Sequence, residues 1–505
     1  MPASRLLFIA CGVTFLLLAI PALAQPPAPT LAPLVRWVDL DVGESQEVEL
    51  ADGKKVRVKL LKVNETRDEL RQAVRHAEVK VDIDGTEVPL VAGNYRLPTT
   101  VAGVQIDCAV TKGYTQNNSK NTAAQDPWGL VKAARLRLWP AGSPWLKPGT
   151  FRYPARQRWL ASGTQMANEP THVDGGEDPR AKNIYYHYGL DIGGSEGRVE
   201  VIAATEGLVI SSGTAVLPGY EDSPVKPRYD VVYLLDPRGW YYRYSHLKTI
   251  DPAIRPGQTV KIGQAVGVLG KEGGSGGWSH LHFDISARQP SGKWGIVEGY
   301  AFLWEAYLAE HQPALLALAR PHQLVSVGQR VTLDGGRSWS KAGKIARFAW
   351  RFTDGTTAEG ATVERTYAKP GVYSEVLQVT DAEGRVEYDF AVVNVLDPAH
   401  TDLLPPSIHV NYAPTFGIKP GDPVTIKVRT FRTTDGRETI DFGDGTPKAE
   451  LQSDGNVKPL AADGYAETVH RFEKPGHYVV RAERTNARGE SAVGHVHIVV
   501  DAPSK

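Results

Sequence analysis

The sequence predicts a mainly β protein of several domains, and three features of the chain carry that prediction. At 505 residues the chain is too long for one ordinary hydrophobic core. Its 50 glycines and 35 prolines, with many Val, Thr and Tyr residues, favour short strands joined by turns over a helical bundle. Two similar stretches near the C-terminal end, each of about 90 residues, indicate two copies of one β module.

The N-terminal segment and the charge balance indicate where the protein works. Arg5 precedes an apolar run over residues 6–20, and a small-residue cleavage site follows at Ala22–Ala24. The run is shorter than the roughly 20 residues that span a bilayer, so we interpret residues 1–24 as a signal peptide. Lys+Arg and Asp+Glu both total 57, which gives no basic field for nucleic acid. We expect an exported protein (periplasm, cell envelope or extracellular) with no nucleic-acid partner and no transmembrane segment in the mature chain.

Cysteine usage predicts a fold without an internal disulfide. Cleavage of the signal peptide removes Cys11 and leaves Cys108 as the one cysteine of the mature chain. Because no Cys-His motif accompanies it, we expect Cys108 to be a small buried hydrophobic residue.

The first part of the mature chain predicts a proline-rich linker over residues 25–34 and an N-terminal β-rich domain over residues 35–160. Alternating apolar and polar residues at Glu47–Leu50 and Val56–Leu60, with an Asp-Gly turn between them, predict a hairpin. One short helical pattern, near Arg67–His76, interrupts the strands.

Residues 161–318 are expected to form the domain that carries the chemistry. The tail of this segment, Val297–Leu318, is its best helical candidate. Short apolar stretches separated by glycines predict strands at Val199–Ala204, Gly207–Ser211, Val231–Leu235 and Trp240–Tyr244.

Beyond this segment the chain repeats itself. Tyr367–Tyr373 (YAKPGVY) matches Phe472–Tyr478 (FEKPGHY). Upstream of each lies an aromatic residue followed by an Asp-Gly turn, at Phe352–Gly355 and Phe442–Gly445. Such turns between short strands predict an all-β sandwich of about seven strands for each copy.

These repeats resemble the PKD family, whose pattern is a Trp-x-Phe-Gly-Asp-Gly turn followed by Tyr-x-x-Pro-Gly-x-Tyr. The resemblance implies two immunoglobulin-like (PKD) β-sandwiches, over residues 319–398 and 406–501. Modules of that family act as spacers or as contacts for proteins and polysaccharides. Protein or polysaccharide contacts through the PKD-like domains are therefore expected.

Four histidines and one aspartate stand out in the central segment. Residues two or four apart in a strand project from the same face. His187 and Asp191 are four apart, and His280 and His282 are two apart, with His246 between the pairs. A zinc hydrolase uses three protein ligands and keeps a fourth position for a water whose pKa falls to about 7. The spacing leaves open which of the histidines would bind the metal.

Three fragments of this segment resemble the lysostaphin-type (LytM-like) zinc metalloendopeptidases of bacterial cell walls. That family's His-x-Gly-x-Asp, Tyr-x-His-Leu and His-Leu-His-Phe motifs stand at His187–Asp191, Tyr244–Leu247 and His280–Phe283. A further typical stretch, Val-x-x-Gly-Gln-x-x-Gly, stands at Val260–Gly267. The resemblance implies a lysostaphin-like β-sheet peptidase domain.

The same resemblance implies a role for each site residue. His187, Asp191 and His282 would hold one Zn²⁺ per chain. His246 and His280 would act as the catalytic pair that orients the water, accepts its proton and stabilises the oxyanion. The protein is then expected to be an enzyme, an exported zinc metalloendopeptidase that cleaves peptide bonds in peptidoglycan or another envelope polymer. Two alternatives are a non-catalytic envelope or adhesion protein and an exported protease of protein substrates.

The chain departs from the family around the expected substrate groove. Trp278, in the glycine-rich loop 270–279, stands where a small residue is common. Residues 216–229 form a longer stretch than usual, and Arg228–Asp230 replaces the usual Tyr-Gly-Asn. These changes bear on peptide specificity and leave the metal residues intact.

A second His-x-His pattern occurs far from the peptidase motifs. His495 and His497 lie near the chain end without a motif partner. We expect them to be ordinary strand residues of the last sandwich.

Overall fold

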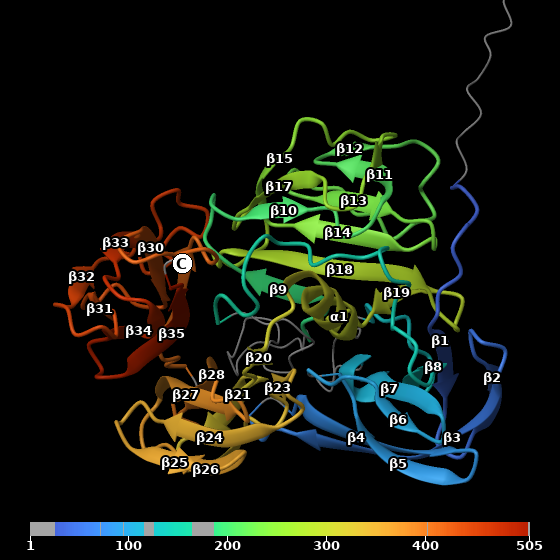
Figure 1. The fold of residues 1–505 in the computed structure, drawn as a ribbon, viewed down its shortest axis with the longest axis horizontal. Helices are drawn as coiled ribbons and strands as arrows, with labels where there is room; N and C mark the ends of the chain where they lie inside the picture. The colour runs from blue at the N-terminus through green and yellow to red at the C-terminus, as the bar shows by residue number, and fades with distance from the viewer. Residues whose placement is uncertain are drawn as a thin grey trace, which may run out of the picture.

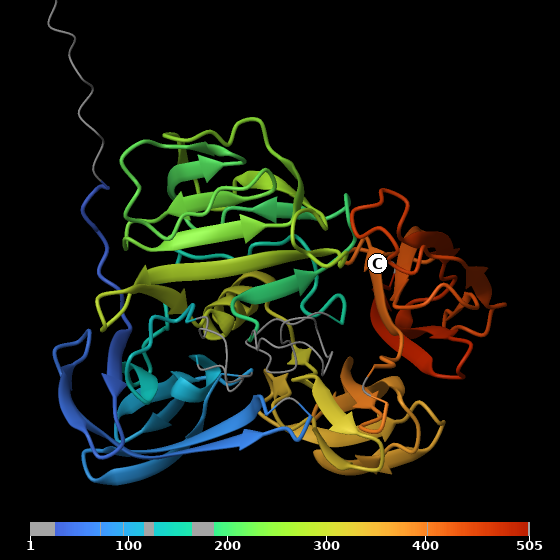
Figure 2. The same cartoon turned by 180° about the vertical axis from the view of Figure 1, so that it is seen from behind.

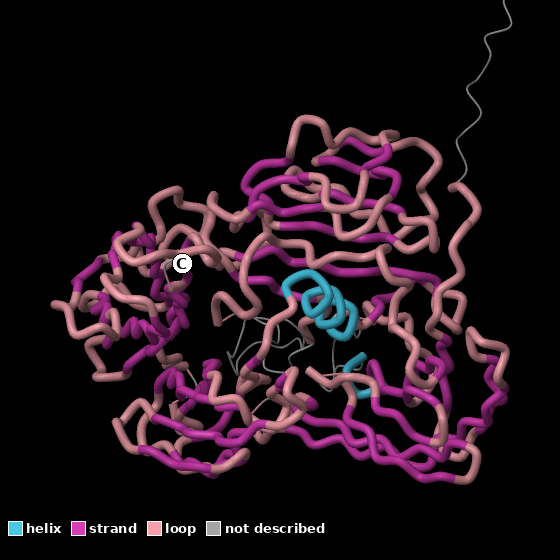
Figure 3. The backbone as a smooth tube through the Cα atoms, viewed as in Figure 1, coloured by secondary structure: helices cyan, strands magenta, loops and turns pink. Residues whose placement is uncertain are grey.

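The computed structural model describes an almost entirely β protein (Figure 1, Figure 3). In the part of the chain that the structure describes, the helices are α1 (Tyr300–His311) and the short 3-10 helix η1 (Lys112–Thr115). Neither is long and apolar enough to cross a membrane. The predicted mainly β, multidomain architecture is confirmed, whereas the predicted signal peptide lies outside the described residues. The described residues are 26–70, 72–93, 95–115, 126–163, 186–400 and 402–502.

The N-terminal part of the chain forms two four-stranded sheets that share one hydrophobic core. The hairpin predicted from the alternating pattern is confirmed as β2 and β3. Cys108 is buried in this core, as expected. The first sheet has the order β1 (Arg36–Leu40), β8 (Ala134–Pro140), β7 (Val104–Thr111), β6 (Thr99–Val101), and the second β2 (Ser45–Glu49), β3 (Lys55–Arg67), β4 (Val74–Ile83), β5 (Thr86–Val91).

The helix predicted near Arg67–His76 is wrong. β3 continues to Arg67, which lies opposite Val74 at the start of β4. Val74 and Ala77 are fully buried in the domain core. Cross-strand pairing and burial therefore outweigh the local helical pattern.

The central domain is built on an eight-stranded sheet in which β18 (His280–Arg288) is paired by three strands. The predicted strands are confirmed, and the predicted helix is confirmed as α1, although it is shorter than the pattern suggested. A three-stranded sheet of β10 (Glu200–Ile202), β17 (Ala265–Leu269) and β15 (Leu247–Ile250) lies beside it. The other strands of the large sheet are β9 (Leu190–Gly193), β11 (Gly207–Ser212), β12 (Ala215–Val216), β13 (Val232–Leu235), β14 (Tyr241–Ser245), β16 (Thr259–Val260) and β19 (Trp294–Val297).

The segment that follows β8 packs with the central domain. Phe151, Tyr153 and Trp159 are buried in the same hydrophobic cluster as the strands of the large sheet. The backbone N–H of Trp159 donates to the Tyr307 hydroxyl on α1 at 3.0 Å. The domain boundary at residue 160 stays a prediction, and the aromatic side chains just before it contribute to the core of the central domain.

Two β-sandwiches follow, drawn in orange and red in Figure 2. They share a continuous sheet. β27 (Gly371–Asp381) and β35 (Ser491–Val500) pair in parallel where Val372 lies opposite Ala492, which joins the two modules. The second module has the predicted seven strands, and the first has nine. The first comprises β20 (Leu315–Leu316), β21 (Gln323–Ser326), β22 (Arg330–Asp334), β23 (Trp339–Ser340), β24 (Ile345–Arg351), β25 (Thr357–Glu359), β26 (Thr362–Thr366), β27 (Gly371–Asp381) and β28 (Val386–Leu396). The second comprises β29 (Ser407–Ala413), β30 (Pro423–Phe431), β31 (Glu438–Asp441), β32 (Ala449–Leu451), β33 (Ala466–Arg471), β34 (Gly476–Thr485) and β35 (Ser491–Val500).

Candidate metal centre

Three of the predicted residues meet at one point of the central sheet. Asp191 on β9 lies directly opposite His282 on β18, and His187 lies just before β9. Asp191 Oδ1 is 3.2 Å from His187 Nε2 and 2.9 Å from His282 Nδ1, and these two nitrogens are 3.3 Å apart. All three side chains are buried. The structure thus forms a compact His/Asp/His cluster from two segments far apart in the sequence.

Gly189 brings His187 into this cluster. Its φ of +83° lies in the left-handed region, and a Cβ at this position would lie 3.0 Å from the Phe283 carbonyl oxygen and 3.1 Å from His282 Nε2. Because β9 begins after Gly189, the strand-face argument holds for Asp191 but is wrong for His187. His187 reaches the cluster through the bend at Gly189.

The cluster fits a tetrahedral metal ion. Zinc with four ligands at about 2.1 Å places neighbouring ligand atoms roughly 3.4 Å apart. The three separations, 2.9, 3.2 and 3.3 Å, are close to this spacing. Two imidazoles and one carboxylate are also a donor set that zinc hydrolases use, with a fourth position left open.

A second carboxylate supports His282. Asp284 Oδ2 lies 3.2 Å from His282 Nε2 and 3.3 Å from Arg243 Nη1, and the Asp284 side chain is buried. A carboxylate on the far nitrogen of a metal-binding imidazole fixes the orientation of the ring and raises its basicity. Asp284 is not among the site residues predicted from the sequence. The available signal was strand alternation, because His280, His282 and Asp284 are successive positions on one face of β18.

The predicted catalytic pair flanks the cluster. The rings of His246 and His280 have centroids 4.7 Å apart, and His246 lies 6.0 Å from the ring of His282. His280 Nε2 is 3.5 Å from Asp191 Oδ1. Burial lowers the pKa of His246 and lowers that of His280 to about 3. Both rings are therefore neutral imidazoles near pH 7.

Backbone carbonyls select the tautomer of both rings. His246 Nδ1 donates to the Glu272 carbonyl oxygen at 2.6 Å, and His280 Nδ1 donates to the Trp278 carbonyl oxygen at 3.1 Å. A carbonyl oxygen only accepts, so the proton of each neutral ring is on Nδ1. The lone pair is then on Nε2, and this atom of each ring is available for proton transfer.

His246 is held by an unusual backbone conformation. Its φ is +67°, in the short link between β14 and β15. Its backbone N–H donates to Asp230 Oδ2 at 2.9 Å, and Arg228 Nη2 donates to the same carboxylate at 2.7 Å. Burial raises the pKa of Asp230, but the hydrogen bonds with His246 and Arg228 outweigh it and hold this pKa well below its usual range. Arg228 and Asp230, which depart from the family pattern, therefore stabilise the turn at His246.

Two family models match the chain. Residues 185–292 match peptidase family M23, which includes the lysostaphin-type and LytM-like peptidases, and residues 311–395 match the PKD domain. The central domain thus resembles M23 peptidase domains over residues 185–292, and the first sandwich resembles PKD domains. The M23 match supports a metallopeptidase-type function for the central domain. No match was found among curated proteins.

Several solved structures resemble parts of the chain. A protein described as a glycyl-glycine endopeptidase lytM from Ruminococcus gnavus is 25% identical over 24% of this chain and 48% of its own length, with a TM-score of 0.20. The chain thus spans about half the length of that structure. Csd3 of Helicobacter pylori is 12% identical over 55% of this chain and 82% of its own, with a TM-score of 0.21. Fibronectin(III)-like modules of CbhA from Clostridium thermocellum are 13% identical over 38% and 98%, with a TM-score of 0.14.

Proposed function

We propose that the protein is an exported zinc metalloendopeptidase that hydrolyses peptide bonds in the cross-links or stem peptides of peptidoglycan. The convergence of His187, Asp191 and His282 at 2.9–3.3 Å is the observation that carries this proposal. The cell-wall substrate rests on the resemblance of the sequence motifs to lysostaphin-type enzymes.

Each polar group of the centre has a role in this proposal. His187, Asp191 and His282 would hold the zinc, and Asp284 would orient His282. Zinc, when bound, would polarise the scissile carbonyl and supply a water with a pKa of about 7.

The catalytic pair, His246 and His280, would accept and donate the proton during hydrolysis. The tautomers place a lone pair on Nε2 of His246 and of His280, and a ring that accepts a proton there becomes a donor. Asp230 would keep His246 in place through its hydrogen bond to the His246 backbone. The pair can therefore take a proton from the attacking water and return one to the leaving amine.

The other domains would bring the enzyme to its substrate. In this proposal the N-terminal domain and the two sandwiches contact envelope polymer, protein or polysaccharide. Residues 1–24 carry the features of an export signal, which agrees with an envelope substrate.

The test is a hydrolysis assay on purified peptidoglycan with zinc-loaded full-length mature protein. New amino groups should appear with the wild type and remain at background with His282→Ala. Equal release by both proteins would contradict the proposal, and so would no release by either. A panel of unfolded proteins in the same assay separates a general exported protease from a cell-wall enzyme. Zinc analysis of the wild type decides against the non-catalytic alternative if the metal is stoichiometric.

A further inference from the structure

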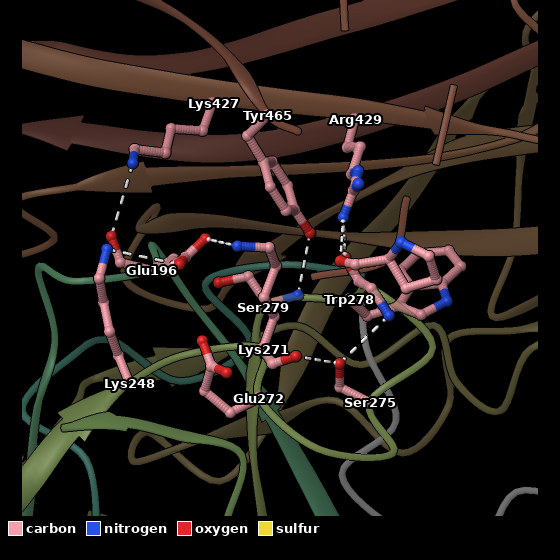
Figure 4. Close-up of polar contacts among 12 residues, drawn as sticks. Glu196, Lys248, Lys271, Glu272, Ser275, Trp278, Ser279, Lys427, Arg429 and Tyr465 are labelled. Carbon is pink, nitrogen blue, oxygen red and sulfur yellow. Dashed lines mark hydrogen bonds and ion pairs between the residues drawn. The ribbon is translucent and has the colours of Figure 1, made fainter. Parts of the chain in front are cut away.

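The glycine-rich loop 270–279 leads directly into β18 and His280, and it lies between the peptidase domain and the second sandwich (Figure 4). Trp278, in this loop, stands where a small residue is common in the family. The proposed hydrolysis gives Trp278 no role, so its contacts decide what it does.

The base of the loop is attached to the peptidase domain. Lys271 Nζ is 2.7 Å from Glu196 Oε2, and both side chains are buried. Ser279 Oγ donates to the Gly194 carbonyl oxygen at 2.7 Å. The His280 backbone N–H donates to the Gly270 carbonyl oxygen at 3.0 Å. These contacts, together with the hydrogen bond from the Gly273 backbone N–H to the Tyr229 hydroxyl at 2.9 Å, attach the two ends of the loop to the peptidase domain.

The tip of the loop is attached to the second sandwich. The ring of Trp278 stacks on Phe431 of β30, with centroids 4.1 Å apart and planes 11° apart. The backbone N–H of Ser279 donates to the Tyr465 hydroxyl at 2.9 Å, and Arg429 Nη1 donates to the Gly277 carbonyl oxygen at 3.0 Å. Figure 4 shows Arg429, on β30, and Tyr465, just before β33, reaching down onto the loop from the second sandwich.

The groups that hold the tip are themselves fixed. Arg429 is fully buried and makes two hydrogen bonds to Asp454, at 2.8 and 2.6 Å. The Tyr465 hydroxyl is 2.8 Å from His409 Nδ1. Burial lowers the pKa of His409 to about 3, so its ring is neutral. The sandwich therefore presents a preformed surface to the loop.

Gly277 shows how closely the two domains approach. Its φ is +87°, and a Cβ at this position would lie 2.2 Å from Asn456 Oδ1 and 2.9 Å from Arg429 Nη1. Asn456 Nδ2 also donates to the carbonyl oxygen of the preceding Gly276 at 3.0 Å. Only glycine meets both the backbone and the space requirement here.

Trp278 connects the second sandwich with His280 of the catalytic pair. The carbonyl of Trp278 accepts the hydrogen bond from His280 Nδ1, while the ring of Trp278 is stacked on the sandwich. The sandwich thus fixes the peptide group that orients the His280 imidazole.

We propose that the second sandwich completes the peptidase site by holding the glycine-rich loop, with Tyr465, Arg429 and Phe431 as positioning residues for His280. This inference rests on the proposed function for its catalytic consequence. Its structural part, the attachment of the loop tip, stands on the contacts alone.

The test is Tyr465→Phe in the full-length protein, with Tyr478→Phe as the matched control. Both tyrosines belong to the second sandwich, and the Tyr478 hydroxyl donates to the Lys474 carbonyl oxygen at 2.8 Å, outside the loop. Tyr465→Phe should lower kcat roughly tenfold or more with little change in KM, because a displaced catalytic group slows chemistry more than binding. Zinc content should stay at the wild-type value, and Tyr478→Phe should behave as wild type.

Hydrogen exchange gives a second readout that does not depend on hydrolysis. Loss of the Tyr465 hydroxyl should speed exchange of the Ser279 amide about fivefold. A merely structural role would speed exchange across β29, β30 and β33 as well. Trp278→Phe keeps an aromatic ring for stacking and should retain most of kcat, whereas Trp278→Ala should lose as much as Tyr465→Phe.

The two failures are distinguishable. If the wild type releases no amino groups but Tyr465→Phe still loosens the loop, the proposed function fails and the docking stands. If Tyr465→Phe and Tyr478→Phe agree in kcat and in exchange of the Ser279 amide, the positioning inference is overturned.

Discussion

The two His-x-His strands of this protein share a sequence pattern but differ in what surrounds them. His280 and His282 on β18 face Asp191 across the pairing with β9. His495 and His497 on β35 lie at the contact between the two sandwiches. The first histidine of each pair is buried to the same degree, 5% exposed.

The difference lies in the partners that neighbouring strands supply. On β18 both histidines lie within 3.5 Å of the same Asp191 oxygen. On β35, His495 Nδ1 is 2.9 Å from the Ser374 hydroxyl, while His497 has its own carboxylate. A metal site therefore needs donors from other segments of the chain, here Asp191 and His187 beside His282, which spacing within one strand does not provide.

The largest effect is expected from removing a ligand. His282→Ala should abolish both stoichiometric zinc and hydrolysis of peptidoglycan, since two ligands hold the metal far less tightly than three. His497→Ala is the matched control on β35 and should keep zinc and activity. Metal analysis of the purified proteins and the amino-group assay measure the two outcomes. Full zinc in His282→Ala would show that the cluster is not the metal site.

The next effect separates the two histidines of β18. His280→Phe should keep zinc but lower kcat by on the order of 10²–10⁴, the range for loss of a general acid or base. Its Nδ1 is held by the Trp278 carbonyl, so the ring is positioned for proton transfer and is not one of the three cluster residues. Zinc loss in this variant would move His280 into the ligand set.

A smaller effect is expected from Glu387, the carboxylate paired with His497 on β35, which should contribute to stability in a pH-dependent way. Glu387 Oε1 is 2.5 Å from His497 Nδ1, and Glu387 Oε2 is 3.0 Å from Arg158. Burial raises the pKa of Glu387, but His497, Arg158 and His477 outweigh it and lower it to about 2. A depressed carboxyl pKa stabilises the fold above the unfolded value of 4.5, and that stability is lost as the pH falls towards 2.

Glu387→Gln should therefore flatten the dependence of stability on pH between 4.5 and 2. At pH 7 the variant should be less stable by about 1–2 kcal/mol, because the partly buried Arg158 and His497 lose their carboxylate partner. Urea unfolding at several pH values measures both. The exposed pair of Arg330 and Glu364 gives the control, since Glu364→Gln should change neither quantity. An unchanged pH profile in Glu387→Gln would remove the assigned structural role.

The resemblance of the short motifs to the family pattern predicted which residues gather, whereas their spacing alone left the ligand set open. It could not give the reason for His187, since that depends on the left-handed bend at Gly189. Asp284 could have been predicted, because it follows His280 and His282 at the next position on the same face of β18. The stacking of Trp278 on Phe431 could not be predicted, because it joins residues of two domains that no local sequence pattern connects.

The smallest effect is expected at the first histidine of β35. His495 stacks on Phe390 with ring centroids 5.3 Å apart, and burial lowers its pKa to about 3, so the ring is neutral. His495→Phe keeps the stacking and loses one hydrogen bond to Ser374, which should cost about 1 kcal/mol in the free energy of unfolding. Zinc content and kcat should not change, in contrast to the same substitution at His280. A fall in kcat would mean that the contact of His495 with the first sandwich also affects the geometry of the active site.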